Sequence, residues 1–193
     1  MTKQEKIELA VETARQAQIR DDICARSVLV GLRTICDRIT EDMITAATSL
    51  AGGSGAACGS CGAYCCGQLA VGLYKNHPLA EELENRALQE VAYGNFTAYR
   101  DRFCEKYGSV LCPEVHKKLF GRSFLLNDPV QEEEFLNLPG HEVVCAEAVA
   151  DATRIAAEMI LADEAYGGKR HEDRRDRRRG RRGLRRRPGP PHE

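Results

Sequence analysis

The sequence predicts an all-α protein, a compact bundle of six or seven helices followed by a disordered, Arg-rich C-terminal tail. Apolar residues recur with the 3.6-residue period of amphipathic helices over most of the chain, and strand-like alternation is hard to find. The 193 residues, 42% of them hydrophobic, suffice for one core of ordinary size. We therefore expect one helical, Cys-rich domain over residues 1–167 and a basic tail over residues 168–193.

The first half of the domain carries the signals of three helices. Residues 3–18 and residues 23–35 each place apolar side chains on one helical stripe. Thr40, which stands ahead of two acidic residues, is typical of a helix start, and the two glycines at 52–53 are typical of a helix stop. A glycine-rich turn is therefore expected before the next helix.

The second half continues the same pattern. Apolar side chains keep helical spacing from residue 79 to residue 107. Pro113 fits the first position of a short helix that ends by Gly121. A last helix is expected over residues 141–163. Helical patterns therefore account for the second half of the domain as well, and no β-sheet is expected.

The tail is the most basic part of the chain. From Gly168 onward, twelve Lys and Arg stand against four Asp and Glu, a net charge of +8, whereas the rest carries sixteen against twenty-five, a net charge of −9. With one Leu and no aromatic residue, the tail cannot bury enough surface to fold. Nonspecific nucleic acid and an acidic protein are two alternatives for what its cations contact, beside a role in solubility.

The chain shows no sign of export or membrane insertion. Its first ten residues, "MTKQEKIELA", lack the apolar core of a signal peptide, and no apolar run approaches the roughly 20 residues that cross a bilayer. We expect a cytoplasmic protein without membrane contact. Because thiols stay reduced in that compartment, the nine cysteines indicate metal or redox chemistry rather than a disulfide framework.

Four of the nine cysteines fall within ten residues, "CGSCGAYCCG". If a helix begins near Cys58 or Ser60, then Cys58, Cys61 and Cys65 lie on one face at positions i, i+3 and i+7. The positive end of such a helix would lower thiol pKa values, so Cys58 and Cys61 are the expected thiolates, the form that binds metals and attacks disulfides. Cys66 points away from this face and is expected in the core.

Two further cysteines also stand near helix starts. Cys112 is followed by His116, and His141 is followed by Cys145, both at the i, i+4 spacing that can place two ligands on one metal. A solvated position on the helix surface is the commoner role for such histidines.

The placement of the cysteines resembles a known family, the redox-active proteins named for the signature C-GCAxxG-C-C, which are similar to the C-terminal domain of split-Soret cytochromes. The resemblance covers nearly all of residues 5–165. The segments that carry it supply Cys24 in "TARQAQIRDDICARSVLVGL", Cys61 in "AGGSGAACGSCGAYCCGQLAVGLY", Cys112 in "YGSVLCPEVHKKLFG" and Cys145 in "HEVVCAEAVADATRIAAEMI".

The resemblance implies a helical domain that holds an iron–sulfur centre, with [2Fe-2S] as the implied type, through these four cysteines and passes electrons to a redox partner protein. A homodimer is a further expectation. Cluster iron is normally held by four thiolates, and hydrogen bonds to sulfur tune its potential. The backbone N–H groups of "GGSG", residues 52–55, are candidate donors. Successive matched cysteines lie 37, 51 and 33 residues apart, so only the folded bundle can bring them together.

The chain departs from the signature in two ways. Cys66 stands where the closing glycine would fall, with Gly67 one place later, and Cys58 and Cys65 add thiols around the core motif. Cys58 and Cys65 therefore stay alternate metal ligands. The split-Soret relatives carry c-type haem, but "CGSCG" lacks the histidine of a haem attachment motif, so no haem is expected.

Two other classes of function stay open. A thiol–disulfide protein would use the C-x-x-C pair of Cys58 and Cys61, and a structural zinc or interaction module would use mixed Cys and His ligands. No Ser-His-Asp arrangement or pair of carboxylates stands out, so no catalytic residue is assigned and a redox component is favoured over a stand-alone enzyme. Cys36 and Cys104 are interpreted as small buried hydrophobes.

Overall fold

The computed structural model describes residues 1–162. The boundary expected near Gly167 and the basic tail expected from residue 168 lie outside the described residues. The helical elements in chain order are α1 (Lys3–Asp21), α2 (Cys24–Arg33), α3 (Glu41–Ala47), a 3₁₀ turn (Thr48–Leu50), α4 (Ala51–Ser54), α5 (Gly62–Lys75), α6 (Leu79–Glu84), a second 3₁₀ turn (Arg86–Leu88), α7 (Gln89–Tyr107), α8 (Cys112–Phe120), α9 (Pro129–Leu136) and α10 (His141–Leu161). The prediction of an all-α fold is confirmed over the described part of the chain.

Local sequence signals explain where several helices begin and end. Thr2 caps α1 in a capping box with Glu5, and Thr40 accepts a hydrogen bond from a backbone N–H in the first turn of α3. Pro113 stands in the first turn of α8, and Gly121 ends that helix in a left-handed conformation. These starts and stops agree with the expectations from sequence.

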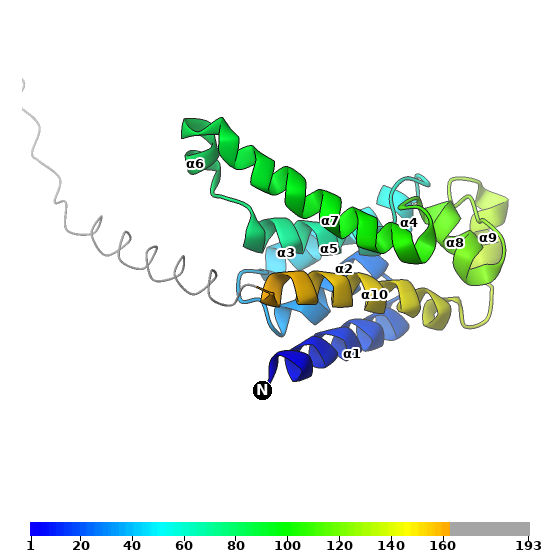
Figure 1. Ribbon diagram of the computed structural model, residues 1–193. Helices are drawn as coiled ribbons and strands as arrows, with labels where there is room; N and C mark the ends of the chain where they lie inside the picture. The colour runs from blue at the N-terminus through cyan, green and yellow to red at the C-terminus, as the bar shows by residue number, and fades with distance from the viewer. Residues whose placement is uncertain (163–193) are drawn as a thin grey trace, which may run out of the picture. The chain divides into compact units, whose positions relative to one another are not determined.

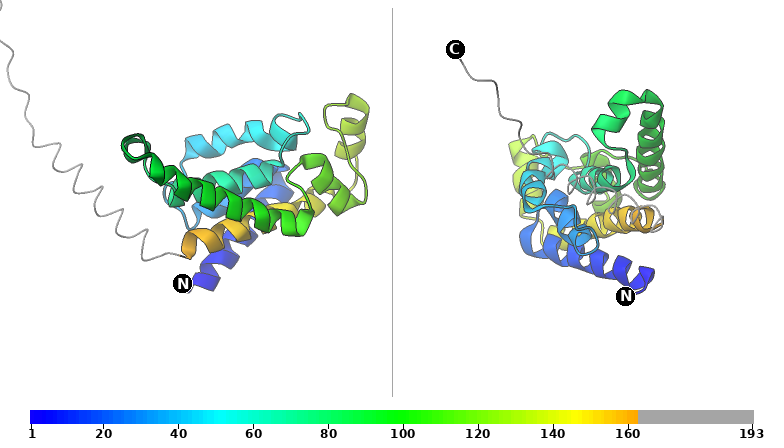
Figure 2. Two further views of the ribbon diagram at one scale, coloured as in Figure 1. Left: turned by 45° about the horizontal axis from the view of Figure 1, so that its top comes forward. Right: turned by 90° about the vertical axis from the view of Figure 1, so that its left-hand side faces the viewer.

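Five helices enclose the core. α10 packs against α1, α2, α5 and α7, and α2 packs against α1 and α5 (Figure 1). α1 approaches α2 closely, because an added side-chain carbon at Gly31 would lie 2.4 Å from the Ala10 carbonyl oxygen. Tyr99, Phe103 and Leu29 are among the largest side chains that are fully buried there. Figure 2 shows α8 and α9 together at one end of this bundle.

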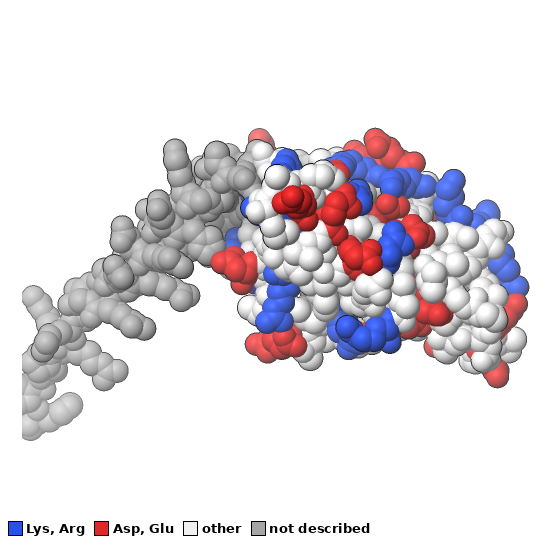
Figure 3. Space-filling model, turned by 90° about the horizontal axis from the view of Figure 1, so that it is seen from below, with Lys and Arg blue, Asp and Glu red and all other residues white. Residues whose placement is uncertain are grey.

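The surface of the bundle mixes charges of both signs. Figure 3, which looks onto the molecule from below Figure 1, shows Lys and Arg interspersed with Asp and Glu. Arg154 donates two hydrogen bonds to the Glu8 carboxylate, at 2.7 and 2.8 Å, and Arg15 pairs with Glu147, so both pairs join α10 to α1. Within residues 1–162, every helix is either too short or too polar to span a bilayer.

The structure divides the helix expected over residues 79–107. Asn85 leaves the helical conformation, with φ −140° and ψ 96°, and its side chain accepts a hydrogen bond from the N–H of Ala87. A short polar side chain that bonds its own backbone competes with helix formation in this way. α6 therefore ends at Glu84, and α7 begins only at Gln89.

Candidate cysteine site

Four cysteines from four helices line one cavity of about 300 Å³. Cys24 and Cys112 are the first residues of α2 and α8, Cys61 is the N-cap of α5, and Cys145 lies near the beginning of α10. All four are free thiols. Because the N-terminal end of a helix carries partial positive charge, this convergence of helix starts favours negative charge in the cavity.

A short backbone pairing joins the segments that carry Cys61 and Cys112. The two segments form an isolated antiparallel β-bridge. Beside it, the N–H of Cys61 donates to the Val110 carbonyl at 2.7 Å, and the N–H of Cys112 donates to the Gly59 carbonyl at 2.8 Å. These bonds fix two cysteines that are 51 positions apart in the sequence on the same wall of the cavity.

A left-handed turn precedes this pairing. The element labelled α4 and the residues after it have positive φ at Gly52, Gly53, Ser54, Gly55, Ala56 and Cys58. The left-handed conformation costs about 1–2 kcal/mol at a residue other than glycine, so the glycines reduce the strain of the turn. Gly53 also needs its small size, because an added carbon would lie 2.8 Å from the Gly59 nitrogen and 3.0 Å from the Cys112 Cβ.

Two glycines of α5 let this helix approach its neighbours. An added carbon at Gly62 would lie 2.9 Å from the Cys24 sulfur, so α5 begins directly against the cysteine of α2. An added carbon at Gly67 would lie 1.9 Å from the Tyr99 hydroxyl oxygen. The glycine that follows Cys66 therefore serves the packing of α5 against α7.

Cys24 is the most acidic thiol of the site. The Cys61 thiol donates a hydrogen bond to the Cys24 sulfur, and this bond is the main reason why the pKa of Cys24 falls to about 7. Backbone N–H groups of Gly52, Ala63 and Ala25 add further hydrogen bonds, which outweigh the opposing effect of burial. One donor, Gly52, comes from the "GGSG" stretch from which such bonds were expected.

The other three thiols hold their protons more tightly. The hydrogen bond to Cys24 and burial raise the pKa of Cys61 well above its ordinary value. Burial raises the pKa of Cys112 to about 12, and burial followed by nearby negative charge raises that of Cys145. Within the metal-free pair, Cys61 therefore acts as the donor and Cys24 takes the negative charge, and the expectation of thiolates at Cys58 and Cys61 stays a prediction.

His116 adjoins Cys112 inside the cavity. Its Nε2 lies 3.6 Å from the Cys112 sulfur, and its ring stacks on Phe135 with centroids 4.6 Å apart. Phe120 and Phe124 meet the ring edge-on. Burial lowers the pKa of His116 to about 4, so the ring is neutral at physiological pH. The expectation of a solvated histidine is wrong here, since the side chain is buried.

His141 is also buried, and both of its ring nitrogens have partners. Nε2 lies 2.7 Å from the Asp22 carboxylate, and Nδ1 lies 3.0 Å from the Leu138 carbonyl oxygen. Burial lowers its pKa, but these two partners outweigh burial, so the pKa of His141 is raised. Both ring nitrogens therefore contact groups other than Cys145, and the ring links α10 to the end of α1.

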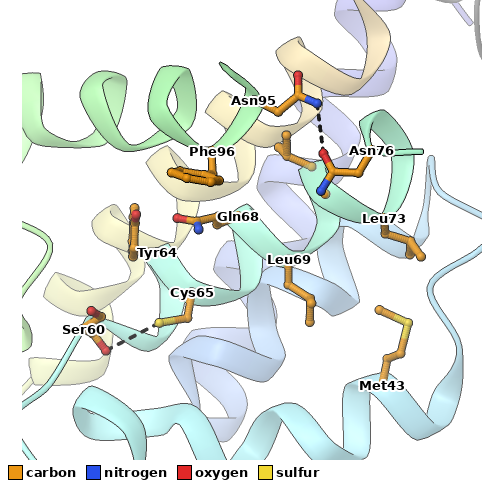
Figure 4. A pocket seen from close by; sticks show the side chains of 12 residues that line it. Met43, Ser60, Tyr64, Cys65, Gln68, Leu69, Leu73, Asn76, Asn95 and Phe96 are labelled. Atoms are coloured by element: carbon orange, nitrogen blue, oxygen red, sulfur yellow. Dashed lines mark hydrogen bonds between the residues drawn. The ribbon is translucent and has the colours of Figure 1, made fainter. Parts of the chain in front are cut away.

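Cys58 and Cys65, the two alternate ligands, are not among the residues that line the cavity. The Cys58 sulfur lies 3.2 Å from the Asn127 side-chain oxygen. The Cys65 sulfur lies 3.8 Å from the Ser60 carbonyl oxygen and lines a second pocket, of about 750 Å³, together with Tyr64 (Figure 4). The structure thus places these two side chains outside the lining of the cavity that Cys24 and its neighbours share.

The helix face expected to unite Cys58, Cys61 and Cys65 does not form. α5 begins at Gly62, with Cys61 as its N-cap, and Cys58 lies in the preceding turn with φ 59°. The backbone pairing to the α8 segment holds residues 59–61 extended, which delays the start of the helix.

The remaining cysteines are outside the cavity lining. Cys66 is fully buried among the core side chains, as expected, and Cys36 is buried as well. Burial raises the pKa of both thiols to about 12. Cys104 is half-buried, so its interpretation as a buried hydrophobe holds only in part.

Three cavity residues were not anticipated from the sequence. Gln18 and Asp22, at the end of α1, and Phe135, in α9, line the same cavity as the four cysteines. Gln18 shares the buried face of α1 with apolar residues such as Ala14. A polar residue on the apolar face of a predicted helix is the one signal in the sequence that could have drawn attention to it.

The described residues contain no group of three or more His, Cys, Asp or Glu side chains arranged to hold a metal ion as they stand. The four cavity cysteines are brought to one cavity, and Cys24 and Cys61 are brought to hydrogen-bonding contact. Ligation would require the thiols to lose their protons and to turn toward a common centre.

Comparison with known proteins places the chain in a family. Residues 23–159 match the family model described as "Putative redox-active protein (C_GCAxxG_C_C)". The match spans more than half of the chain, which therefore belongs to this family of redox-active proteins, and it includes all four cavity cysteines. No match was found among curated proteins or among solved structures.

Proposed function

We propose that Cys24, Cys61, Cys112 and Cys145 hold an iron–sulfur centre of the [2Fe-2S] type and that the protein transfers electrons. The observation that carries the proposal is that these four free thiols, from four different helices, line one cavity. When bound, such a centre would supply one-electron chemistry.

The donor set of the cavity fits such a group. Cluster iron is normally held by four thiolates, and a diiron cluster distributes them as two pairs rather than around one ion. Cys24 and Cys61 already form one hydrogen-bonded pair. Three of the four cysteines stand at helix starts, whose partial positive charge stabilises thiolates.

Neighbouring groups of the chain would tune the centre. The N–H groups of Gly52 and Ala63 point to the Cys24 sulfur, and hydrogen bonds to ligand sulfur raise a reduction potential by stabilising added negative charge. His116, close to Cys112, can donate from Nε2 to that sulfur in the same way.

The first experiment is the iron, zinc and acid-labile sulfide content of full-length protein purified without oxygen, together with its visible spectrum. Equal iron and sulfide, with absorption that bleaches on reduction, is the expected result. A colourless protein after cluster reconstitution would contradict the proposal, and one zinc per chain would support the structural zinc module instead.

Single substitutions then assign the ligands. Ala at Cys24, Cys61, Cys112 or Cys145 is expected to remove most of the bound iron. Cys58→Ala and Cys65→Ala are matched controls from the same segment and should retain iron, because these side chains do not line the cavity. Loss of iron in the controls, with retention in the four others, would overturn the ligand set.

A second candidate is a dithiol site formed by Cys24 and Cys61, which differs from the C-x-x-C pair expected from sequence. The low pKa of Cys24 and its hydrogen bond from Cys61 favour this candidate. The Cys24 thiolate would attack a small disulfide, and Cys61 would then displace the second thiol, so the substrate gains two electrons as Cys24 and Cys61 form a disulfide. Mass spectrometry of metal-free protein treated with glutathione disulfide tests it, since a Cys58–Cys61 bond or no internal disulfide would contradict it.

A further inference from the structure

An apolar arm extends from the bundle. The arm consists of residues 79–98, which form α6, the second 3₁₀ turn and the first half of α7, and Figure 1 shows α6 at the end of α7 opposite α8. No side chain of this described segment is buried. Leu79, Leu83, Tyr93 and Val91 are 71%, 73%, 63% and 42% exposed. Because monomeric proteins seldom expose large apolar patches, this arm has the character of a protein interface.

The arm continues an apolar stripe that is buried farther along the same helix. Apolar residues keep helical spacing from residue 79 to residue 107. Within α7, Tyr99 and Phe103 are 0% exposed, whereas Leu88 and Phe96 are only half-buried. A helix of six residues, such as α6, also has little stability in water without packing, yet α6 buries no side chain. The described chain therefore covers only the second half of a face that has the pattern of a covered one.

A groove lies beside the arm. It is the pocket of about 750 Å³ that Cys65 lines, and it runs between α3, α5 and α7, with Met43, Leu69 and Phe96 on its walls (Figure 4). Leu69 is 47% exposed. Among the described residues, twelve line the groove and none of the twelve carries a charge. The groove therefore suits an apolar segment of protein.

The arm and the groove form one continuous face. Asn95 lines the groove and lies one helical turn after Val91 of the arm. The Tyr93 ring meets the Phe96 ring on the groove wall, with centroids 5.0 Å apart. Asn95 also donates a hydrogen bond to the Asn76 side-chain oxygen at 3.0 Å, which ties α7 to the end of α5. The exposed side chains of the arm thus extend the lining of the groove.

A second copy of the chain fits this face, because each copy offers both halves of one contact. α6 is a helix with an apolar side that buries nothing, and the groove is an uncharged surface that such a helix can cover. Around a two-fold axis, the same contact forms twice, so one arrangement covers both arms and both grooves. The twelve groove residues and one side of the arm also approach the roughly 20 residues, or about 800 Å², that each partner contributes to a stable interface.

We propose that the chain forms a two-fold homodimer in which the arm of each copy packs into the groove of the other. Leu79 and Leu83, one turn apart on α6, lie against Leu69 and Met43 of the second copy. The dimer covers Cys65 in the groove wall. This inference goes beyond the proposed electron transfer and does not depend on it.

The first test is analytical ultracentrifugation of full-length, reduced protein over a range of concentrations in high salt. The expected result is twice the mass of one chain, with dissociation to single chains on dilution. High salt screens attraction between the basic C-terminal residues, with a net charge of +8, and the remainder, with −9, whereas apolar contacts persist. A single-chain mass at every concentration, or association that salt abolishes, would overturn the inference.

Substitutions on the two surfaces locate the interface. Leu83→Arg on the arm and Leu69→Arg in the groove should each raise the dimer Kd at least about tenfold, because the new charge loses water in an apolar contact. Val130→Arg is the matched control, since Val130 is 75% exposed on α9, outside the arm and the groove, and this variant should stay dimeric. Circular dichroism and Tm check that each variant folds. Folded Leu83→Arg and Leu69→Arg variants with an unchanged Kd would show that the inference is wrong.

An equal mixture of the two variants tests whether arm meets groove. Each variant alone has both contacts damaged, but a mixed dimer keeps one contact between an intact arm and an intact groove. The mixture should therefore associate at concentrations at which each variant alone is a single chain. If it associates no better than the separate variants, arms do not pack into grooves and the inference fails.

Iron and sulfide measured on the same samples keep the two proposals apart. Neither Leu69 nor Leu83 lines the cysteine cavity, so both variants should retain the iron of the wild type. A dimer without iron would refute the cluster and keep the interface, whereas iron and sulfide in a protein that stays a single chain would keep the cluster and refute the interface.

Discussion

Cys24 obtains its acidity from groups that lie far apart in the sequence. The thiol of Cys61 and the N–H groups of Gly52 and Ala63 all donate to one sulfur, although they are 28 to 39 positions away along the chain. Cys112 also stands at a helix start, but burial raises its pKa. At this scale, the hydrogen-bond donors around Cys24 distinguish it from Cys112.

This difference predicts the pH dependence of one thiol. In reduced, metal-free protein, alkylation of Cys24 by iodoacetamide should reach half its maximal rate near pH 7, because its pKa is lowered to about 7. Cys61→Ala removes the main donor and should move this midpoint to higher pH, whereas Cys58→Ala should not. Mass spectrometry of the labelled peptides measures the rates.

The same lowered pKa has a consequence for stability. A thiol whose pKa is lower in the folded than in the unfolded protein stabilises the fold fully above the unfolded pKa, and loses this contribution as the pH falls through the folded pKa. The contribution of Cys24 to the free energy of unfolding should therefore rise between pH 7 and pH 9 in the metal-free protein, whereas the buried thiols with raised pKa values lower the total over the same range. The difference in unfolding free energy between the wild type and Cys24→Ala cancels those other thiols and should grow from pH 7 to pH 9. A constant difference would contradict the prediction.

The left-handed turn of residues 52–58 is the element that assembles the site. It places Gly52 beside the Cys24 sulfur and Gly53 against Cys112, while the segment after it pairs with the start of α8. Local strain of this kind is retained where the surrounding structure stabilises it, and it is common at functional sites. The turn therefore links the positions of three of the four cysteines.

A pair of glycine substitutions tests the role of this turn. Gly53 and Gly108 both have positive φ, but an added carbon meets Gly59 and Cys112 at the first position and nothing within 4 Å at the second. Gly108→Ala should cost about 1 kcal/mol of unfolding free energy. Gly53→Ala should cost about 2 kcal/mol more and should also reduce iron binding. Urea unfolding and iron content measure the two effects, and equal results for both variants would contradict this role.

In the described domain as a whole, the site depends on how α1, α2 and α10 pack. α1 supplies Gln18 and Asp22, α2 begins with Cys24, and α10 carries Cys145, so the cavity walls move with these helices. The close contact between α1 and α2 relies on small side chains, since Gly31 faces Ala10 and Ala14. Surface ion pairs between α1 and α10 add little, because exposed pairs contribute about 0–1 kcal/mol.

This packing predicts opposite effects for two helical glycines. Gly31→Ala should destabilise the protein by about 2 kcal/mol or more, because the new carbon would overlap Ala10 and Ala14. Gly94→Ala should stabilise it by about 1 kcal/mol, since nothing lies within 4 Å and alanine favours α7. Thermal and urea unfolding measure both. A neutral Gly31→Ala would mean that α1 and α2 can separate without cost.

The sequence by itself determined the helical class, most helix boundaries and the four cysteines of the family signature. These features depend on local signals, such as the cap at Thr40, the proline at Pro113 and the apolar period of each helix. The family membership also follows from the sequence, because the order and local context of the cysteines carry it.

Only the tertiary structure decided which thiols meet and which one ionises. The start of α5 depends on pairing with residues 110–112, and this pairing moves Cys58 away from the helix on which spacing had placed it. The burial of His116 and His141, the acidity of Cys24 and the unpartnered oxygen of Gln18 each depend on groups from other helices. Burial and hydrogen bonding between distant segments set these properties, and the periodic spacing of apolar residues along the chain does not predict them.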